Sequence, residues 1–247
     1  MTQEFSFETQ SATDIQGKSG TYLLYSPPGM GKTSTIKYLP GRTLVLDIDR
    51  TSHVLKGCEN IDIIYVDNVN TWEFWEKLLI HIQKNLKGKY DNIVVDNVSE
   101  LERCLLSDLG SKGKNKGVPA QGDYQYMQFR IVNSLRWMKG LGMRVIFTAW
   151  ETTDLFTDAN SQQFNRAYPQ INQKILNNVL GLCDVVGRLM VNSEGGRGYV
   201  LTASNSVYAK NQLDDRKGCL QNELILNEEN QMEETKNTNV NGGNENV

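Results

Sequence analysis

The residues best suited to chemistry lie at positions 26–34, in the sequence SPPGMGKTS. The apolar run YLLY before them predicts a buried strand, and Lys32 and Thr33 open a predicted helix at 32–39. Gly29 and Gly31 allow positive φ angles, which bring successive backbone N–H groups toward one anion, and the start of the helix adds its positive dipole end. This order predicts a P-loop that holds a nucleoside triphosphate.

Individual roles in this loop follow from the chemistry of a triphosphate. Lys32 is expected to reach the β- and γ-phosphates of ATP, and the Thr33 hydroxyl is expected to bind Mg²⁺. Ser26 stands where the consensus has glycine, and serine tolerates the turn that this position shapes. The alternative interpretation is a glycine-rich strand-to-helix turn without a ligand. The predicted nucleotide-binding residues are Ser26, Pro27, Pro28, Gly29, Met30, Gly31, Lys32, Thr33 and Ser34.

Carboxylates follow two further apolar runs. In YDNIVVDN, three apolar residues before Asp96 predict a buried strand that carries a carboxylate to the ligand-binding edge of an open α/β sheet. Downstream of a P-loop this is a Walker B pattern, so Asp96 is expected to hold the Mg²⁺ shell. The run RTLVLDID predicts another strand, which ends at Asp47 and Asp49.

The elements that position these residues alternate between strands and helices. Apolar runs predict strands at 42–48, 61–66, 92–96 and 144–149, and helical spacing predicts helices between them. The polar segment 152–174 has no sustained period and predicts a functional or mobile loop. Residues 182–192 and 198–203 predict strands joined by a glycine hairpin. The pattern therefore predicts an α/β domain.

Length and charge set the predicted organisation. A chain of 247 residues, 39% of them hydrophobic, predicts one core at 20–220, after a flexible arm at 1–19. Residues 221–247 carry six Glu and one Lys and predict an acidic disordered tail, which leaves the rest of the chain mildly basic. Four widely spaced cysteines and no long apolar run predict a cytoplasmic protein without a membrane span.

A cationic loop follows the Walker B region. The segment GSKGKNKGVP at 110–119 interleaves glycines with Lys112, Lys114 and Lys116. Such a loop can follow a nucleic-acid backbone, or it can be a solvated linker.

Together, these motifs resemble the RecA-like ATPase core, and more narrowly the phage-encoded RecA-like nucleotide-binding proteins of the AAA type, some of which act in single-strand annealing or recombination. The resemblance covers about residues 20–212. It implies a RecA-like P-loop NTPase core with a mostly parallel central sheet, helices on both faces and a C-terminal antiparallel hairpin. It also implies single-stranded DNA as a ligand, assembly into a homo-oligomeric ring or filament, and a single-strand-binding protein as a possible partner.

The resemblance also implies residue roles. The acidic residue that polarises the attacking water falls at Asp49, with Asp47 as its nearest competitor. The lysine that reaches a neighbouring subunit's ATP falls at Lys210, so the implied catalytic set is Asp49, Lys32, Asp96 and Lys210. Gln212 replaces the family's arginine, for which Arg216 is a stand-in. The DNA-contacting loops fall at 110–123 and 152–174, where Arg166 and Tyr168 are plausible contacts.

The chain departs from the family at Trp150, where a polar sensor of the γ-phosphate is usual. Thr148 or Glu151 are the available substitutes. Three functions therefore remain open: a Mg²⁺-dependent, DNA-binding ATPase, a nucleotide-switched annealing protein with little turnover, and a small-molecule P-loop kinase. The kinase is disfavoured because the segment 152–174 has one arginine where a kinase lid is arginine-rich.

Overall fold

The structure is a computed structural model that describes residues 9, 11 and 20–225. The predicted arm, apart from positions 9 and 11, and the predicted tail beyond position 225 lie outside the described residues. Among the described residues, no helix is long and apolar enough to cross a membrane.

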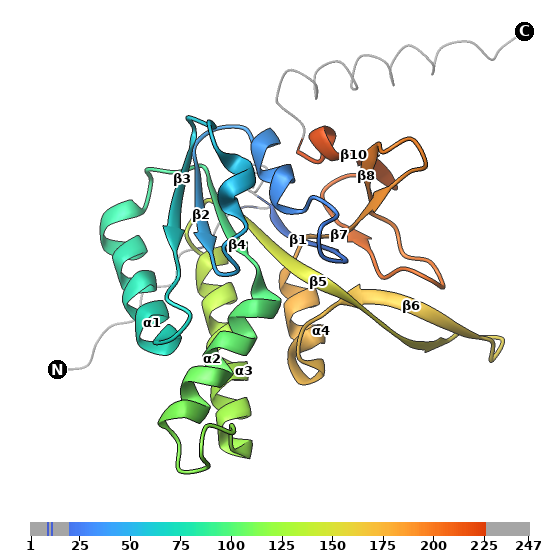
Figure 1. Ribbon diagram of the computed structural model, residues 1–247. Helices are drawn as coiled ribbons and strands as arrows, with labels where there is room; N and C mark the ends of the chain where they lie inside the picture. Colours follow the sequence, from blue (N-terminus) through green and yellow to red (C-terminus); the bar gives the residue numbers. More distant parts are fainter. Residues whose placement is uncertain (1–8, 10, 12–19, 226–247) are drawn as a thin grey trace, which may run out of the picture.

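A single twisted sheet forms the centre of the domain (Figure 1). Its main path runs β10-β8-β7-β1-β5-β4-β2-β3, while β6 pairs with β5 and β9 pairs with β7. The strands from β7 to β3 along this path are parallel, and β8, β9 and β10 add antiparallel pairs at one side. The strands are β1 (Thr21–Ser26), β2 (Thr43–Asp47), β3 (Ile61–Tyr65), β4 (Asn92–Asp96), β5 (Arg144–Thr157), β6 (Gln163–Pro169), β7 (Val185–Val191), β8 (Arg197–Val200), β9 (Lys210–Asn211) and β10 (Gly218–Leu220).

Helices cover the two faces of the sheet unequally. The α-helices pack on one face, where Trp75, Leu101 and Val179 join a core with the strand residues Leu23 and Leu46. Short 3-10 helices and the C-terminal segment cover the other face. The helices are α1 (Thr71–His81), α2 (Val98–Lys112), α3 (Gln121–Lys139), α4 (Gln173–Leu182), the 3-10 helices η2 (Thr33–Tyr38), η3 (Ser52–Leu55) and η5 (Gln221–Glu223), and the π-helix η4 (Ile82–Leu86).

This architecture confirms the predicted α/β fold class. All residues of β1, β2 and β4 are buried, as expected of parallel strands covered on both faces. Because parallel strands place their carboxyl ends at one edge, the P-loop after β1 and the aspartates that end β2 and β4 meet at the same edge. Asp47 is the register partner of Asp96 across this pair of strands.

The prediction of a structureless loop at 152–174 is wrong. β5 continues past Trp150 and pairs antiparallel with β6, so most of the segment is a hairpin that projects from the body of the domain (Figure 1). The Asp158 carboxylate closes its turn by accepting the backbone N–H groups of Asn160 and Gln162. α4 then follows, and its N-cap is Asn172, whose side chain accepts the Lys174 N–H.

Two further boundaries differ from the prediction. The helix expected at 32–39 is a 3-10 helix of six residues, η2, and Leu39 is already extended, as is usual for a residue before proline. Leu224 and Ile225 are buried against the face that carries η2, so the folded domain extends five residues beyond the predicted boundary at position 220.

Candidate functional site

The loop between β1 and η2 has the geometry of an anion cradle. Gly29 and Gly31 have φ angles of 80° and 103°, in the region that favours glycine. Gly29 is exposed, and a Cβ added to it would meet nothing within 4 Å, so its positive φ and not lack of space is what favours glycine there. Because η2 is only two turns long, the cradle depends on the loop amides and on Lys32 more than on a helix dipole.

Lys32 is a buried cation held by neutral oxygens. Its Nζ donates to the carbonyl oxygens of Ser26 and Pro27 at 3.0 and 3.1 Å and to the Ser26 hydroxyl at 3.3 Å. None of the salt bridges in the described part of the chain includes Lys32. Burial lowers the pKa of this ammonium, and the more distant carboxylates of Asp96 and Asp49 oppose that effect. The ammonium is therefore available to pair with a phosphate.

Thr33 and Asp96 form the adjacent oxygen pair. The Thr33 hydroxyl donates to Asp96 Oδ2 at 2.6 Å, and the Thr148 hydroxyl donates to Oδ1. Burial raises the pKa of Asp96 to about 6, although both hydrogen bonds act in the opposite direction. A hydroxyl and a carboxylate fit Mg²⁺, which keeps several waters and phosphate oxygens in its shell. No cluster of three or more acidic, His or Cys ligands occurs among the described residues, so nucleotide and water oxygens would complete that shell.

Asp49 belongs to the same cluster, while Asp47 does not. Thr51 donates to Asp49 Oδ1 at 2.8 Å, and the Asn97 amide donates to Oδ2 at 2.5 Å. The Thr51 hydroxyl also lies 3.2 Å from that of Thr33, which links Asp49 to the predicted metal ligands. Burial is the main cause that raises the pKa of Asp49.

Asp47, the competing candidate, serves the backbone. Its carboxylate is fully buried and accepts the N–H groups of Arg50 and Ser52 at 2.8 and 3.2 Å. Those two bonds fix the turn that presents Asp49. The geometry therefore favours Asp49 as the carboxylate that can face a substrate.

An ion pair joins the two strands that neighbour β1 in the sheet, near the end of β1. Glu151 on β5 and Arg188 on β7 form this pair, and two hydrogen bonds of 2.8 Å connect their side chains. The neighbouring Trp150 packs its ring against the Arg103 guanidinium, 4.4 Å from the ring centre. Of the two proposed substitutes for the γ-phosphate sensor, Thr148 bonds Asp96 and Glu151 bonds Arg188.

One protein family accounts for most of the chain. The sequence model of a family described as an AAA domain matches residues 18–213, a segment that includes the P-loop, Asp49, Asp96 and Lys210. The chain belongs to this AAA domain family. It is thus an AAA-type P-loop NTPase by family, and the match supports nucleotide binding. No curated protein matches the chain.

The AAA domain does not bring Lys210 to its own P-loop. Lys210 pairs with Val186 on β7, and its Nζ donates to the Leu180 carbonyl at the end of α4, 2.9 Å away. Burial lowers the pKa of this lysine. A role in a neighbouring subunit's site stays a prediction, and it would require Lys210 to leave the Leu180 carbonyl.

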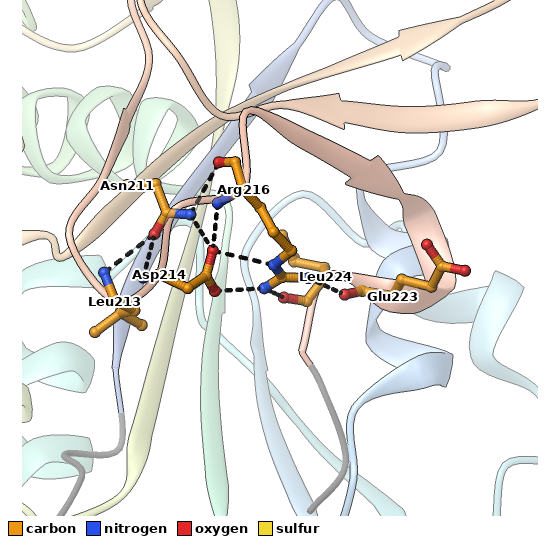
Figure 2. A network of polar contacts seen from close by, with 6 residues as sticks. All are labelled: Asn211, Leu213, Asp214, Arg216, Glu223 and Leu224. Atoms are coloured by element: carbon orange, nitrogen blue, oxygen red, sulfur yellow. Dashed lines mark hydrogen bonds and ion pairs between the residues drawn. The ribbon is translucent and has the colours of Figure 1, made fainter. Parts of the chain in front are cut away.

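Arg216, the stand-in for the missing arginine, anchors the C-terminal segment of the AAA domain (Figure 2). Its guanidinium bonds both carboxylate oxygens of Asp214, at 3.1 and 2.8 Å. It also donates to the carbonyls of Glu223 and Leu224 at 2.7 and 3.2 Å. These contacts fix the segment that carries η5, so the structure gives Arg216 a structural role in its own subunit.

The residues predicted to contact DNA lie in two separate projections of the AAA domain. Lys112 pairs with Asp108 at 2.7 Å near the end of α2, while Lys114 and Lys116 are exposed in the loop that joins α2 to α3. Figure 1 shows this loop and the β5–β6 hairpin extending away from the central strands. Their assignment to DNA stays a prediction.

On the hairpin, Arg166 and Tyr168 lie in one aromatic cluster. The Arg166 guanidinium lies 4.3 Å from the ring centre of Phe156 and 5.5 Å from that of Tyr208. The Tyr168 ring stacks on Tyr208 with centroids 5.6 Å apart. Arg166 and Tyr168, the two predicted DNA contacts, are therefore already packed against neighbouring rings. A DNA base could stack only on the ring faces that this packing leaves open.

Three functional neighbours of the P-loop were not predicted from the sequence. Arg197 Nε donates to the Met30 carbonyl at 3.0 Å, and the Gln221 amide donates to the Gly31 carbonyl at 2.8 Å. Thr51 was also missed, although its place two residues after Asp49 was a usable signal. Arg197 and Gln221 are more than 160 residues from the loop, so local patterns could not connect them to it.

Proposed function

We propose that this protein is a Mg²⁺-dependent ATPase that assembles into a homo-oligomer and binds single-stranded DNA. The observation that carries the proposal is Lys32, a buried ammonium without an ion-pair partner among the described residues, beside the Thr33 and Asp96 oxygens. A buried charge costs several kcal/mol unless a counter-ion compensates it, and a triphosphate supplies that counter-ion. The AAA domain family supports the same ligand.

The residues of the site divide the work of phosphoryl transfer. Lys32 and the loop amides bind the phosphates, and Thr33 and Asp96 would hold Mg²⁺, which neutralises phosphate charge when it is bound. Asp49 orients the attacking water and accepts a hydrogen bond from it. Thr51 and Asn97 each donate a hydrogen bond to one oxygen of Asp49. These two bonds limit the rotation of the carboxylate and so keep it facing the γ-phosphate position.

Single-stranded DNA is the proposed second ligand. The exposed Lys114 and Lys116, with Lys112, give the α2–α3 loop a positive charge that suits a phosphate backbone. The loop follows α2, which begins directly after Asp96 and Asn97, so a single helix joins the proposed metal site to the loop. We assign the protein to phage-type recombination, annealing or replication, with a single-strand-binding protein as a candidate partner.

A second candidate function is a nucleotide-switched annealing protein with little turnover. The observation that favours it is the end of the parallel part of β5, where Trp150 packs on Arg103 and Glu151 is paired with Arg188. Neither side chain is poised to report the γ-phosphate. Binding and hydrolysis therefore need separate measurements.

The experiment that tests the proposal measures the ATPase rate with and without single-stranded DNA, beside the particle mass with a non-hydrolysable ATP analogue. Stimulation by DNA together with assembly supports the ATPase. DNA binding with assembly but without turnover supports the switch. Failure to bind ATP or DNA would contradict both.

A further inference from the structure

The nucleotide site has two distinguishable sides. Thr33, Asp96 and Asp49 lie on the side of β1 that carries β5, β4 and β2, because the sheet order is β7-β1-β5-β4-β2. If Thr33 and Asp96 hold the Mg²⁺ that accompanies ATP, the terminal phosphates would lie beside these oxygens. The α-phosphate and the nucleoside would then extend toward the opposite side, where β7 and β8 form a hairpin.

Arg197, the first residue of β8, lies on this second side. Its Nε donates to the Met30 carbonyl at 3.0 Å, and a Cβ added to Gly31 would come within 3.0 Å of the same nitrogen. The guanidinium therefore lies against the loop that is expected to hold phosphates. Its side chain is exposed, and none of the salt bridges in the described part of the chain includes it.

The turn that carries Arg197 is well fixed. Asn192 donates its backbone N–H to the Gly196 carbonyl at 2.9 Å, and its side-chain oxygen accepts the Gly196 N–H at 2.7 Å. Because the backbone is held in this way, the arginine side chain can change its partner without a rearrangement of the hairpin.

The P-loop also keeps its support when Arg197 leaves. The Gln221 amide holds the Gly31 carbonyl at 2.8 Å and the Thr35 hydroxyl at 2.9 Å, and Thr35 is held in turn by Tyr199 at 2.7 Å. The bond from Arg197 to Met30 joins a cation to a neutral oxygen, and Gln221 gives the loop a second support. A phosphate is a stronger partner for a guanidinium than a carbonyl.

We propose that Arg197 is a nucleotide-binding residue that acts within its own subunit and moves from the Met30 carbonyl to the α-phosphate when ATP or ADP binds. This inference rests on the proposed function, because it requires a nucleotide at the P-loop. Arg197 would be a second cation that binds the phosphates, on the β7–β8 side, besides Lys32 in the loop itself.

The test is a titration of the full chain with ATP and with ADP, each with Mg²⁺, by calorimetry. R197A is expected to weaken both nucleotides by about 10-fold, because ATP and ADP share the lost charged hydrogen bond. R197K is expected to retain most of the affinity. R197Q, which keeps a donor for the Met30 carbonyl but no charge, is expected to behave like R197A. The matched control is R136A, which removes an exposed arginine on α3 that bonds Asn133.

Three results would overturn the inference. Wild-type affinity in R197A would show that Arg197 does not contact the nucleotide. Wild-type affinity in R197Q would show that Arg197 only supports the loop. A loss of affinity confined to ATP would show that Arg197 contacts the γ-phosphate and not the α-phosphate. If the wild-type chain itself binds neither nucleotide, the proposed function fails before Arg197 is tested. Thermal melting of each variant shows whether it is folded.

Discussion

The substitution Asp96→Asn is predicted to stabilise the protein without nucleotide while it removes Mg²⁺-dependent ATP binding. Asp96 is buried, and its pKa is raised from a usual value of 3.8 to about 6, chiefly by burial. At about 1.4 kcal/mol for each tenfold change in a proton equilibrium, this displacement costs the folded state about 3 kcal/mol at neutral pH. Asparagine avoids the buried charge and can still bond Thr33 and Thr148.

The pH dependence of the stability gain distinguishes the removal of a buried charge from a change in side-chain packing. A carboxyl group with a raised pKa in the folded state destabilises that state as pH rises from about 4 to about 6, and the full cost is present above that window. The gain from Asp96→Asn is therefore expected to be about 3 kcal/mol at pH 7 and to shrink to about 1 kcal/mol at pH 4.5.

Urea unfolding at both pH values, with a chelator and no nucleotide, measures this gain. Asp215→Asn, at an exposed aspartate, is the matched control and is expected to leave stability unchanged. A variant that is less stable than the wild type at pH 7, or a gain that is equal at both pH values, would refute the reasoning. The same variant is expected to lose Mg²⁺-dependent ATP binding, as measured by titration with and without Mg²⁺.

Three further predictions concern other parts of the domain. Asp49→Asn is expected to retain ATP binding and to lose hydrolysis, measured as phosphate release, and unchanged turnover would assign the water to another group. Neutralising the lysines of the α2–α3 loop is expected to weaken single-strand binding and to reduce the slope of affinity against salt by up to about two; an unaltered slope would leave this loop a linker. The substituted residues are Lys112, Lys114 and Lys116. Glu102→Gln is expected to stabilise the fold at pH 8 and not at pH 4, because burial raises the pKa of Glu102 from 4.5 to about 7, and equal unfolding midpoints at pH 8 would contradict this.

The parallel core could be predicted from the sequence because its signals are local. An apolar strand before SPPGMGKT and another before Asp96 are each complete within about ten residues, and the rules of parallel sheets then bring their ends to one edge. The strand rules placed Asp47 and Asp49 at this edge, and the family resemblance pointed to Asp49. That the backbone N–H groups of a turn already occupy Asp47 is visible only in the structure, and the catalytic role of Asp49 stays a prediction.

Other features were not predicted, because their sequence signal is weak, was overlooked or depends on a distant partner. The β5–β6 hairpin is polar and largely exposed, so it lacks the apolar alternation that marks a half-buried strand. α4 buries Ile175, Leu176, Val179 and Leu180, whose spacing is helical, so a usable signal for this helix was overlooked. Lys210 has a partner, the Leu180 carbonyl, that the sequence alone does not reveal.

The most direct test of the central claim is a calorimetric titration of the full chain with ATP and Mg²⁺, for the wild type, Lys32→Ala and Lys37→Ala. Lys37 is an exposed lysine on η2, the short helix that follows Lys32, so its variant controls for charge and for local helix stability. The wild type and Lys37→Ala are predicted to bind ATP alike, and Lys32→Ala is predicted to bind at least about 30-fold more weakly. Equal affinity in all three proteins would contradict a phosphate site at this loop.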